Sequence, residues 1–353
     1  MIELTDNGVK KIKLIVMIPA YNEGKTIGKV IEEVPRDFEG VDEVRVMVMD
    51  DCSSDGTIEA AKRAGADHIF RQKQNCGLGR NFKKGIDCAL RLGADIIVNI
   101  DADGQFNPKD IPKLIQPILG HEADMVTCTR FKNHELTKNM PWIKKWGNKR
   151  FTNLVNKITG KKFTDTQCGF RAYSREAALR LNLHGQFTYT QESFIDLVEK
   201  GMIIKEVPLE VNYFKERDSK VSGNLSKYGF RSLGIIAKTT RDTQPLTFFG
   251  LPAMAIFGLG FLGGLFSFVY WLIEHATTPV KTLFQVSVFF MIFGLLLFIL
   301  GLIADMMRTI KRNQDEILYR LKRADIGSNG NGFIDVLKKV DDPKSQRLSK
   351  WRK

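Results

Sequence analysis

Two aspartates and a glutamine alternate along one short stretch, Asp101-Ala102-Asp103-Gly104-Gln105. Alternate side chains of an extended segment point to the same side, so Asp101 and Asp103 can share a hard cation and Gln105 adds a carbonyl oxygen. An all-oxygen set suits Mg²⁺ or Mn²⁺, which bind one or two carboxylates while phosphates supply further ligands. Taken alone, the same stretch is also typical of a solvated acidic turn, so its meaning depends on its neighbours.

Two further polar clusters lie earlier in the chain, at residues 19–23 (Pro-Ala-Tyr-Asn-Glu) and 50–57 (Asp-Asp-Cys-Ser-Ser-Asp-Gly-Thr). An aromatic ring beside acidic and amide groups can stack on a nucleobase and accept hydrogen bonds from the base or the ribose. The alternative is that residues 22–24 only form a turn and residues 53–55 only cap a helix. A phosphate-binding glycine loop is excluded, because the sequence has no GxxxxGK[ST] and Gly77-Leu78-Gly79 does not complete GxGxxG.

Apolar and β-branched runs come directly before these clusters. Such runs predict strands covered on both faces at residues 14–18, 44–49, 96–100 and 125–129. Amphipathic segments between and after them predict helices at residues 26–34, 57–64, 80–92 and 109–119. This order indicates an α/β domain with a mostly parallel, doubly wound sheet, in which ligands bind beyond the carboxyl ends of the strands. The polar clusters lie at those ends.

Together the three clusters resemble, in order, the signatures of inverting family 2 glycosyltransferases with the GT-A (Rossmann-like) fold. Within that family the chain is most similar to dolichol-phosphate mannose synthases and related polyprenyl-phosphate sugar transferases, over residues 12–240. The resemblance implies a divalent metal, Mg²⁺ or Mn²⁺, at Asp101, Asp103 and Gln105. It also implies a donor site made of Pro19, Tyr21, Asn22, Glu23, Asp51, Ala102, Asp103 and Gln105.

Downstream residues extend the resemblance. Arg130, after the run at 125–129, stands where the family has an arginine near the phosphates, and Arg171 belongs to a glycine-aromatic-arginine stretch bordering the acceptor site. Arg217 and Lys220 resemble a flexible Arg-x-x-Ser-Lys loop, although the spacing here is one residue short. The resemblance thus implies that these four cations bind the acceptor and phosphates. The alternatives are a surface ion pair for Arg130 and a charge at the sheet edge for Arg171.

The implied reaction moves one sugar from GDP-mannose or a UDP-hexose to a polyprenyl or dolichyl phosphate, with inversion. A phosphate monoester is largely ionised at pH 7, so it can attack the anomeric carbon without a protein base. Asp101, Asp103 and Arg130 are then the catalytic groups that stabilise the departing pyrophosphate. Glu192 stands where hydroxyl-accepting relatives carry a catalytic carboxylate; here it is expected to position the sugar or support the metal, and a structural role stays open.

The C-terminal third contains two uncharged apolar stretches, residues 246–273 and 282–304, each long enough to cross a hydrocarbon layer of about 30 Å. Basic residues on both flanks place those flanks in the cytosol by the positive-inside rule, so the chain is expected to be a two-helix protein of the cell membrane with both termini cytoplasmic. The predicted domains are a catalytic domain (1–222), an interfacial amphipathic helix (223–243), the two spans (244–305) and a basic helix and tail (306–353). Gly258, Gly260, Gly263 and Gly264 give the first span a small-residue face.

Composition narrows the remaining classes. The net charge of +13 suits an anionic partner, and five widely spaced cysteines support neither a disulfide framework nor a zinc site. No signal peptide is expected at the N-terminus. One alternative is a membrane-bound polysaccharide synthase, which the missing Gln-x-x-Arg-Trp motif disfavours; another is a non-enzymatic basic scaffold binding lipid or nucleic acid, which leaves the strand-end acids unexplained. The expected partners are a nucleotide sugar, a polyprenyl phosphate and the bilayer, with no nucleic acid, and self-association is plausible.

Overall fold

The computed structural model describes residues 11–132, 140, 142–183, 189–211, 241, 244–276 and 278–327. The chain forms two compact units, one made of residues 1–217 and 318–353 and the other of residues 218–317. Arg217, Lys220, nearly all of the predicted interfacial helix and the C-terminal tail after residue 327 lie outside the described residues.

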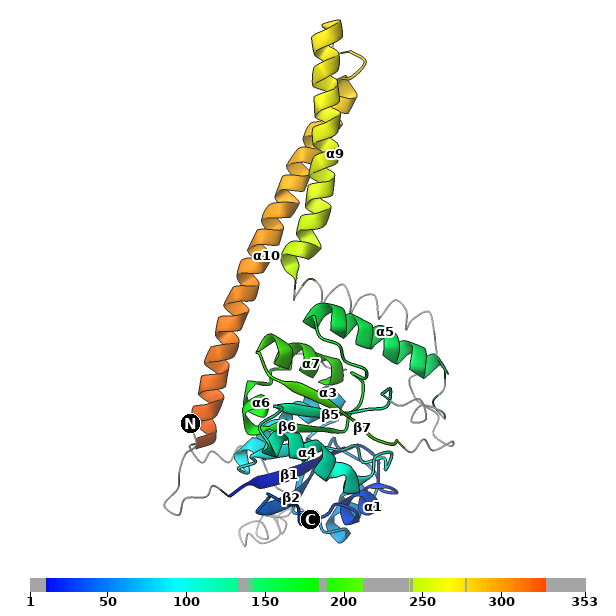
Figure 1. Cartoon of the computed structure of the whole chain (residues 1–353), viewed down its shortest axis with the longest axis vertical. Coiled ribbons are helices and arrows are strands. Elements are labelled where there is room, and N and C mark those ends of the chain that lie inside the picture. Colours follow the sequence, from blue (N-terminus) through cyan, green and yellow to red (C-terminus); the bar gives the residue numbers. More distant parts are fainter. Residues whose placement is uncertain are drawn as a thin grey trace, which may run out of the picture. The chain divides into compact units, whose positions relative to one another are not determined.

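The first unit is built on a seven-stranded sheet with the strand order β3-β2-β1-β4-β6-β5-β7. Figure 1 labels strands β1, β2, β5, β6 and β7 of this sheet. The four predicted strands are confirmed as β1 (Lys13–Ala20), β2 (Glu43–Asp50), β4 (Ile96–Asn99) and β5 (Met125–Thr129). The patterns did not identify three short strands, β3 (His68–Arg71), β6 (Arg171–Ser174) and β7 (Ile204–Pro208). The mixed but mostly parallel order confirms the predicted fold class.

Strand β6 runs antiparallel to both of its neighbours, β4 and β5, while the other pairings are parallel. Asn99, the last residue of β4, pairs with Arg171, the first residue of β6. The segment before β6 therefore reaches the same edge of the sheet as the segments that follow β4 and β5. This reversal brings residues 165–170 to the polar clusters, although they do not follow a strand.

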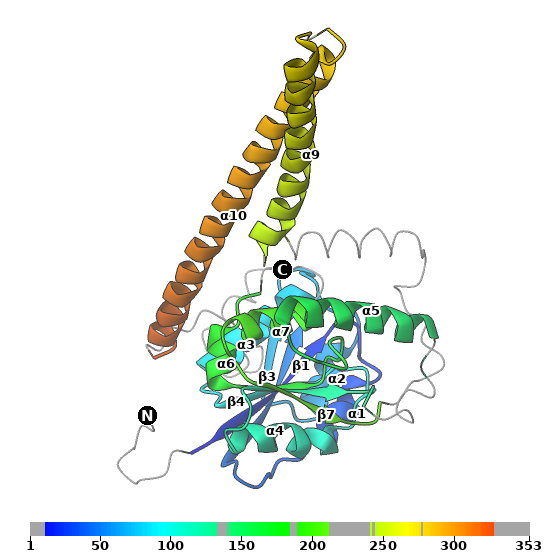
Figure 2. The ribbon, with the colours of Figure 1, turned by 45° about the horizontal axis from the view of Figure 1, so that its top comes forward.

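Helices cover both faces of the sheet, because residues along each buried strand alternate between two apolar cores. Leu14, Val16 and Ile18 face the core under α1 (Ile27–Glu32), α2 (Thr57–Arg63) and α4 (Ile111–Leu119), which follows a 3₁₀ turn at Pro108–Asp110. Ile15 and Met17 face the opposite core. Figure 2 shows that core's helices on the other side of the sheet from α4: α3 (Leu78–Arg91), α5 (Trp142–Thr159), α6 (Arg175–Arg180) and α7 (Tyr189–Glu199).

The second unit contains the two predicted spans, found in α9 (Pro245–Glu274) and the first part of α10 (Lys281–Gly327). Both helices are long and apolar enough to cross a membrane, with mean hydropathies of 1.9 and 2.9 in windows that are only 11% and 17% buried. Apolar helices left so exposed indicate a membrane protein rather than the core of a soluble one. The pair packs closely, since a Cβ on Gly260 would lie 2.7 Å from the backbone oxygen of Ser287.

Helix α10 is longer than the predicted span, and its last turns belong to the first unit. Tyr319 is only 8% exposed and joins the core of α3, α6 and α7, where the guanidinium carbon of Arg180 lies 4.3 Å from its ring centroid. Lys322 donates to the carbonyl oxygen of Leu181 (3.1 Å) and lies 3.8 Å from a carboxylate oxygen of Asp87. The end of α10 is thus an integral part of the first unit.

Candidate active site

The loops after β1 and β2 are joined by hydrogen bonds. Asn22, with a φ of +55°, accepts a hydrogen bond from the backbone N–H of Ser54 (2.9 Å) and donates its own N–H to the hydroxyl of Ser53 (2.9 Å). The backbone N–H of Glu23 donates to the hydroxyl of Thr57 (2.9 Å). These contacts fix the loops and leave the ring of Tyr21 44% exposed. Asn22 therefore serves the loop geometry as well as any ligand.

Asp51 is buried and fixes the backbone that leads into α3. Its carboxylate accepts hydrogen bonds from the backbone N–H groups of Cys76 and Gly77, both at 2.8 Å. Its own N–H donates to the carbonyl oxygen of Ala20 (2.9 Å), which links it to the loop that carries Tyr21. Asp51 thus shapes the floor of the site that the resemblance assigns to the donor.

The carboxylates of Asp101 and Asp103 follow β4 and lie close to other charged side chains. Burial raises the pKa of Asp101 to about 7, and the negative charge of Asp103 adds to the increase. The backbone of Gly169 passes directly over Asp101, since a Cβ there would lie 2.6 Å from a carboxylate oxygen. Asp103 accepts a hydrogen bond from the backbone N–H of Gln105 (3.1 Å), which closes a turn around Gly104.

Other charged residues named from the sequence converge on Asp101. The positive charges of Arg171 and Arg130 lower its pKa, and the negative charge of Glu23 raises it. Strands β4 and β5 end on either side of the segment before β6, whose Gly169 lies against Asp101 and whose Asp165 pairs with Arg130, so these residues lie at one end of the sheet. The structure thereby brings together clusters that lie far apart in the sequence.

The oxygen ligands at this end of the sheet, from Asp101, Asp103 and Gln105, fit a divalent cation. Asp101, whose pKa is raised by burial and by the negative charge of Asp103, lies where positive charge is lacking, and a hard cation would supply it. Within the described ranges no group of three or more His, Cys, Asp or Glu residues could enclose a metal. Two aspartates and one amide leave coordination positions for phosphate oxygens, as is usual for Mg²⁺.

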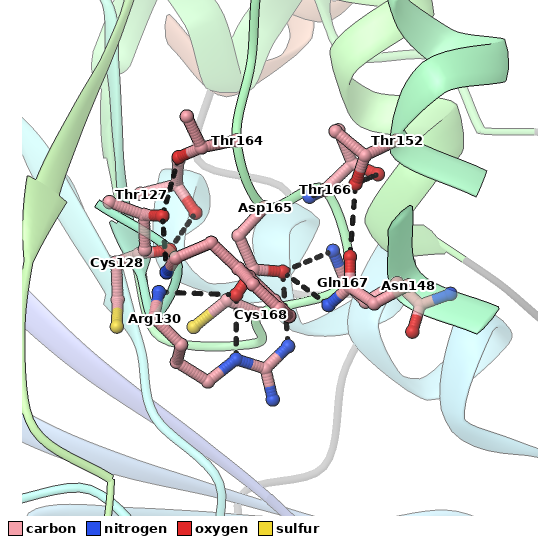
Figure 3. A network of polar contacts seen from close by, with 12 residues as sticks. Thr127, Cys128, Arg130, Asn148, Thr152, Thr164, Asp165, Thr166, Gln167 and Cys168 are labelled. Carbon is pink, nitrogen blue, oxygen red and sulfur yellow. Dashed lines mark hydrogen bonds and ion pairs between the residues drawn. The ribbon is translucent and has the colours of Figure 1, made fainter. Parts of the chain in front are cut away.

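Arg130 lies at the carboxyl end of β5, in a bidentate ion pair with Asp165 (Figure 3). Its Nε and Nη2 donate to the two carboxylate oxygens at 2.6 and 3.0 Å, and its backbone N–H also points to Asp165, at 3.3 Å. The side chain of Asp165 is fully buried and that of Arg130 is 13% exposed. The pair fixes the direction of the guanidinium, so Arg130 is more than a surface ion-pair partner.

Two further elements hold Asp165 in place. On α5, Asn148 donates to its carboxylate at 2.8 Å, and the backbone N–H of Gln167 donates at 3.1 Å. On β7, Glu206 accepts from the backbone N–H groups of Thr164 and Asp165, at 2.8 and 2.9 Å. Burial alone would raise the pKa of Asp165, but Arg130 and these donors lower it below its ordinary value. Asp165 is therefore an ionised, preorganised support for Arg130.

Arg171 does not reach solvent. It is fully buried, and its guanidinium donates to the carbonyl oxygens of Cys168 (2.7 Å), Thr190 (2.8 Å) and Thr166 (3.1 Å). Its strand β6 lies inside the sheet, between β4 and β5, so the expectation that Arg171 is a charge on an outermost strand is wrong. The implied contact with the acceptor does not fit this placement either; Arg171 instead ties residues 166–168 to the start of α7.

Glu192 lies in the first turn of α7, and its side chain is half-buried. Tyr189, at the start of the same helix, is buried and stacks on Phe82 of α3. Helix α7 therefore packs on the apolar core, and its start lies beside residues 166–168, which Arg171 contacts. This placement is compatible with a positioning role for Glu192.

Three supporting residues were missed by sequence reasoning. They are Asp165, Asn148 and Asn99, whose side-chain amide donates to the carbonyl oxygen of Gly169 (2.7 Å). Asn148 lies on a helix that the patterns did not predict. A buried asparagine at the end of an apolar run was the available signal for Asn99.

Comparisons with known proteins identify the family of the chain. Residues 15–181 match the model of the family described as glycosyl transferase family 2. The chain is 33% identical to UDP-N-acetylglucosamine–dolichyl-phosphate N-acetylglucosaminyltransferase of Methanococcus voltae, covering 57% of this chain and 86% of that protein.

It is also 29% identical to polyprenol monophosphomannose synthase of Mycolicibacterium smegmatis, covering 60% of this chain and 82% of that protein. Among solved structures, glucosyl-3-phosphoglycerate synthase of Mycobacterium tuberculosis with UDP is similar at 23% identity and a TM-score of 0.49, covering 65% of this chain and 79% of that chain. The family match and the relative from Methanococcus voltae establish that this chain is a glycosyltransferase and belongs to glycosyltransferase family 2.

Proposed function

We propose that the protein transfers one sugar from a nucleotide-sugar donor to a polyprenyl phosphate, with inversion at the anomeric carbon. The placement of Asp101, Asp103 and Arg130 at one end of the sheet, around the segment that holds Asp165 and Gly169, carries this proposal. Two features support a lipid acceptor. The chain has two helices that are suited to a bilayer, and the two relatives named above act on dolichyl phosphate or are named as a polyprenol monophosphomannose synthase.

The donor binds across the loops after β1, β2 and β4. Tyr21 offers an exposed ring for the base, Asp51 and Glu23 offer acceptors for base or ribose, and Pro19, Asn22 and Ala102 shape the backbone around them. Asp101, Asp103 and Gln105 hold Mg²⁺ or Mn²⁺, which, when bound, neutralises negative charge on the departing nucleoside diphosphate. The two relatives carry different sugars in their names, so GDP-mannose and UDP-hexoses are both candidate donors.

The acceptor phosphate needs alignment more than activation. As a largely ionised monoester it attacks without giving up a proton, so the protein must only place its oxygen in line with the leaving group. Arg130, held by Asp165, supplies positive charge that is already oriented when the reaction begins. Arg217 and Lys220 remain proposed contacts of the acceptor phosphate.

The membrane arrangement follows from the charges that flank the spans. Arg308, Lys311 and Arg312 follow the second apolar stretch, whereas the short connection between the spans is nearly neutral. We therefore place the catalytic unit and both termini on the cytosolic side, where nucleotide sugars are present. The bilayer and the polyprenyl phosphate are the partners that this placement requires.

A labelling assay tests the proposed function. The purified full chain is incubated with several radiolabelled nucleotide sugars and extracted polyprenyl phosphate, and the products are separated into lipid and polymer fractions. We expect label in a lipid that releases its sugar on mild acid hydrolysis. Label in polymer would instead indicate a polysaccharide synthase, and no transfer from any donor would support a binding scaffold.

Replacing Glu192 with glutamine tests the base-free mechanism. Because the acceptor is already ionised, Glu192→Gln is expected to keep at least about a tenth of the turnover, whereas loss of a general base lowers rates by about 10²–10⁴-fold. Steady-state kinetics with a saturating donor measure the effect. Complete loss of turnover with donor binding intact would contradict the mechanism.

A further inference from the structure

Three hydrogen-bond donors contact the carboxylate of Asp51. One oxygen, Oδ1, accepts from the backbone N–H of Cys76 (2.8 Å) and also from the thiol of Cys76, whose Sγ lies 3.0 Å away. The other oxygen, Oδ2, accepts from the backbone N–H of Gly77 (2.8 Å), whose φ of +82° is one that glycine adopts without strain. Cys76 and Gly77 thus hold both oxygens of this carboxylate from the start of α3.

The acceptor positions of Asp51 limit the hydrogen bonds that a ligand can add. An ionised carboxylate has about four lone-pair positions, two on each oxygen. The backbone N–H and the thiol of Cys76 use both positions on Oδ1, and the backbone N–H of Gly77 uses one on Oδ2. As far as the described residues are concerned, a single position, on Oδ2, is left for a ligand.

The thiol of Cys76 remains a donor at neutral pH. Burial raises its pKa to about 11, and the hydrogen bond to Asp51 adds to the increase. The thiol therefore keeps its proton, which it donates to Oδ1 of Asp51. Cys76 is only partly buried, so its side chain lies between this oxygen and the outside of the protein.

Asp51 is linked to the aromatic ring that is proposed to stack on the base. Its backbone N–H donates to the carbonyl oxygen of Ala20 (2.9 Å), the residue before Tyr21, and the ring of Tyr21 is 44% exposed. Asp51 itself is only 3% exposed. So small an opening admits one donor atom of a base to the carboxylate, and not two donors side by side. The exposure of Asp51 therefore agrees with the single open position on Oδ2.

The bases of the two candidate donor classes differ in the hydrogen-bond donors that they present. Uracil has a single N–H, at N3, between two carbonyl groups. Guanine has two parallel donors, the N1–H and the 2-amino group, which fit a carboxylate only when both of its oxygens can accept. At Asp51 one of the two guanine donors would stay unpaired, and an unpaired buried donor weakens binding by about 5- to 150-fold. The site therefore fits uracil better than guanine.

We propose that Asp51 and Cys76 select a uridine nucleotide, so that the donor is a UDP-sugar rather than a GDP-sugar. This inference rests on the proposed function, which places the donor at Asp51, and deepens it by naming the nucleotide. Asp51 contacts the base with its one open acceptor position. Cys76 acts through Asp51: its thiol fills the position on Oδ1 that the second donor of guanine needs. Cys76 is thus a specificity-determining residue.

Equilibrium binding of free nucleotides tests the selection without reference to turnover. The full chain in detergent is titrated calorimetrically with UDP, GDP and inosine diphosphate (IDP) in the presence of Mg²⁺. IDP has the purine ring of GDP but only the N1–H, so comparing the two removes the effect of ring size. We expect GDP to bind at least about tenfold more weakly than UDP and at least about fivefold more weakly than IDP. UDP methylated at N3, which lacks the single N–H, should bind at least about tenfold more weakly than UDP.

Replacing Cys76 tests its part in the selection. Cys76→Ala removes the thiol but keeps the backbone N–H, so the affinity for GDP should rise at least about fivefold relative to that for IDP. Cys76→Ser keeps a donor at this place and should keep the wild-type order of affinities. The matched control is Cys52→Ala, which removes a partly exposed thiol that lies 3.8 Å from the carbonyl oxygen of Lys73, and it should bind all three nucleotides like the wild type.

The outcomes separate this inference from the proposed function. GDP binding as tightly as UDP to the wild type would overturn the selection, and so would a ratio of GDP to IDP affinity that Cys76→Ala leaves unchanged or that Cys52→Ala changes equally. Transfer from a GDP-sugar to polyprenyl phosphate at least as efficient as from a UDP-sugar would refute the selection and keep the proposed function. Preference for UDP in a protein that transfers sugar to no lipid would keep the selection and refute the proposed function.

Discussion

Asp103→Ala is expected to abolish sugar transfer, lowering turnover by at least about 10³-fold, while the protein stays folded. Asp103 is one of two carboxylates that converge with Arg130, and its backbone environment is a turn that alanine can also adopt. Its removal takes away a ligand of the proposed cation and with it the charge that stabilises the leaving group. Because Asp103 raises the pKa of Asp101, its loss also relieves repulsion and should not lower the melting temperature.

Asp110→Ala provides the matched control for this experiment. Asp110 lies close behind in the chain, at the end of the 3₁₀ turn, and pairs only with the exposed Lys113 among the contacts described for it. It should keep near-normal turnover, and EDTA should inactivate this variant and the wild type alike. Turnover above about a tenth of wild type in Asp103→Ala, or full activity after EDTA, would refute the role given to this carboxylate.

Asp165→Ala is expected to lower both stability and activity. The variant leaves Arg130 and the amide of Asn148 without the carboxylate that satisfies them, and removing one partner of a buried ion pair costs about 3 kcal/mol. For a unit of this size that corresponds to a fall in Tm of roughly 6–12 °C. Turnover should fall about 10²-fold, because a guanidinium that is no longer held loses its alignment with the phosphates.

The pH dependence of stability identifies the ionised carboxylate as the source. The pKa of Asp165 is lowered in the folded protein, so its contribution is present above the unfolded value of about 4 and is lost as the pH falls through the folded value. The difference in Tm between the wild type and Asp165→Asn should therefore be constant near neutral pH and shrink below about pH 4. Asp37→Asn, at an exposed position, is the control. A difference that persists unchanged at strongly acidic pH would show that the carboxylate's charge is not responsible.

Much of the fold could be predicted from the sequence, because its signals are local. The four predicted strands are continuous apolar runs that are covered on both faces of the sheet. The observed ends of each strand lie within three residues of the predicted ends. Asp101 and Asp103 follow directly from the end of β4, as expected, but residues 102–104 form a turn and do not continue the extended strand, and the role of the two carboxylates stays a prediction. The family membership rested on three such local motifs in order, and it is confirmed.

The rest depends on contacts between distant segments, which no local pattern contains. Strand β6 is only Arg-Ala-Tyr-Ser, and its reversed direction is set by pairing with β4 and β5. The burial of Arg171 depends on carbonyl groups of Thr166, Cys168 and Thr190 that only the folded chain brings around it. The role of Asp165 likewise depends on distant segments, since Arg130, Asn148 and Glu206 contact it only in the folded chain.

The anchoring of Tyr319 between α3 and α6 bears on how this enzyme can be divided for biochemical work. A shortened chain that stops at Val211 keeps every residue proposed to bind the sugar donor. It lacks Tyr319, however, so the surface around Arg180 on which the phenol ring packs would be exposed to solvent. The partners of Lys322, among them Asp87, would lose their cation as well. A water-soluble version of the catalytic part is better made by replacing the two apolar helices with a hydrophilic linker and retaining residues 318–327. The end of α10 can then pack against α3 and α6 as it does in the full chain.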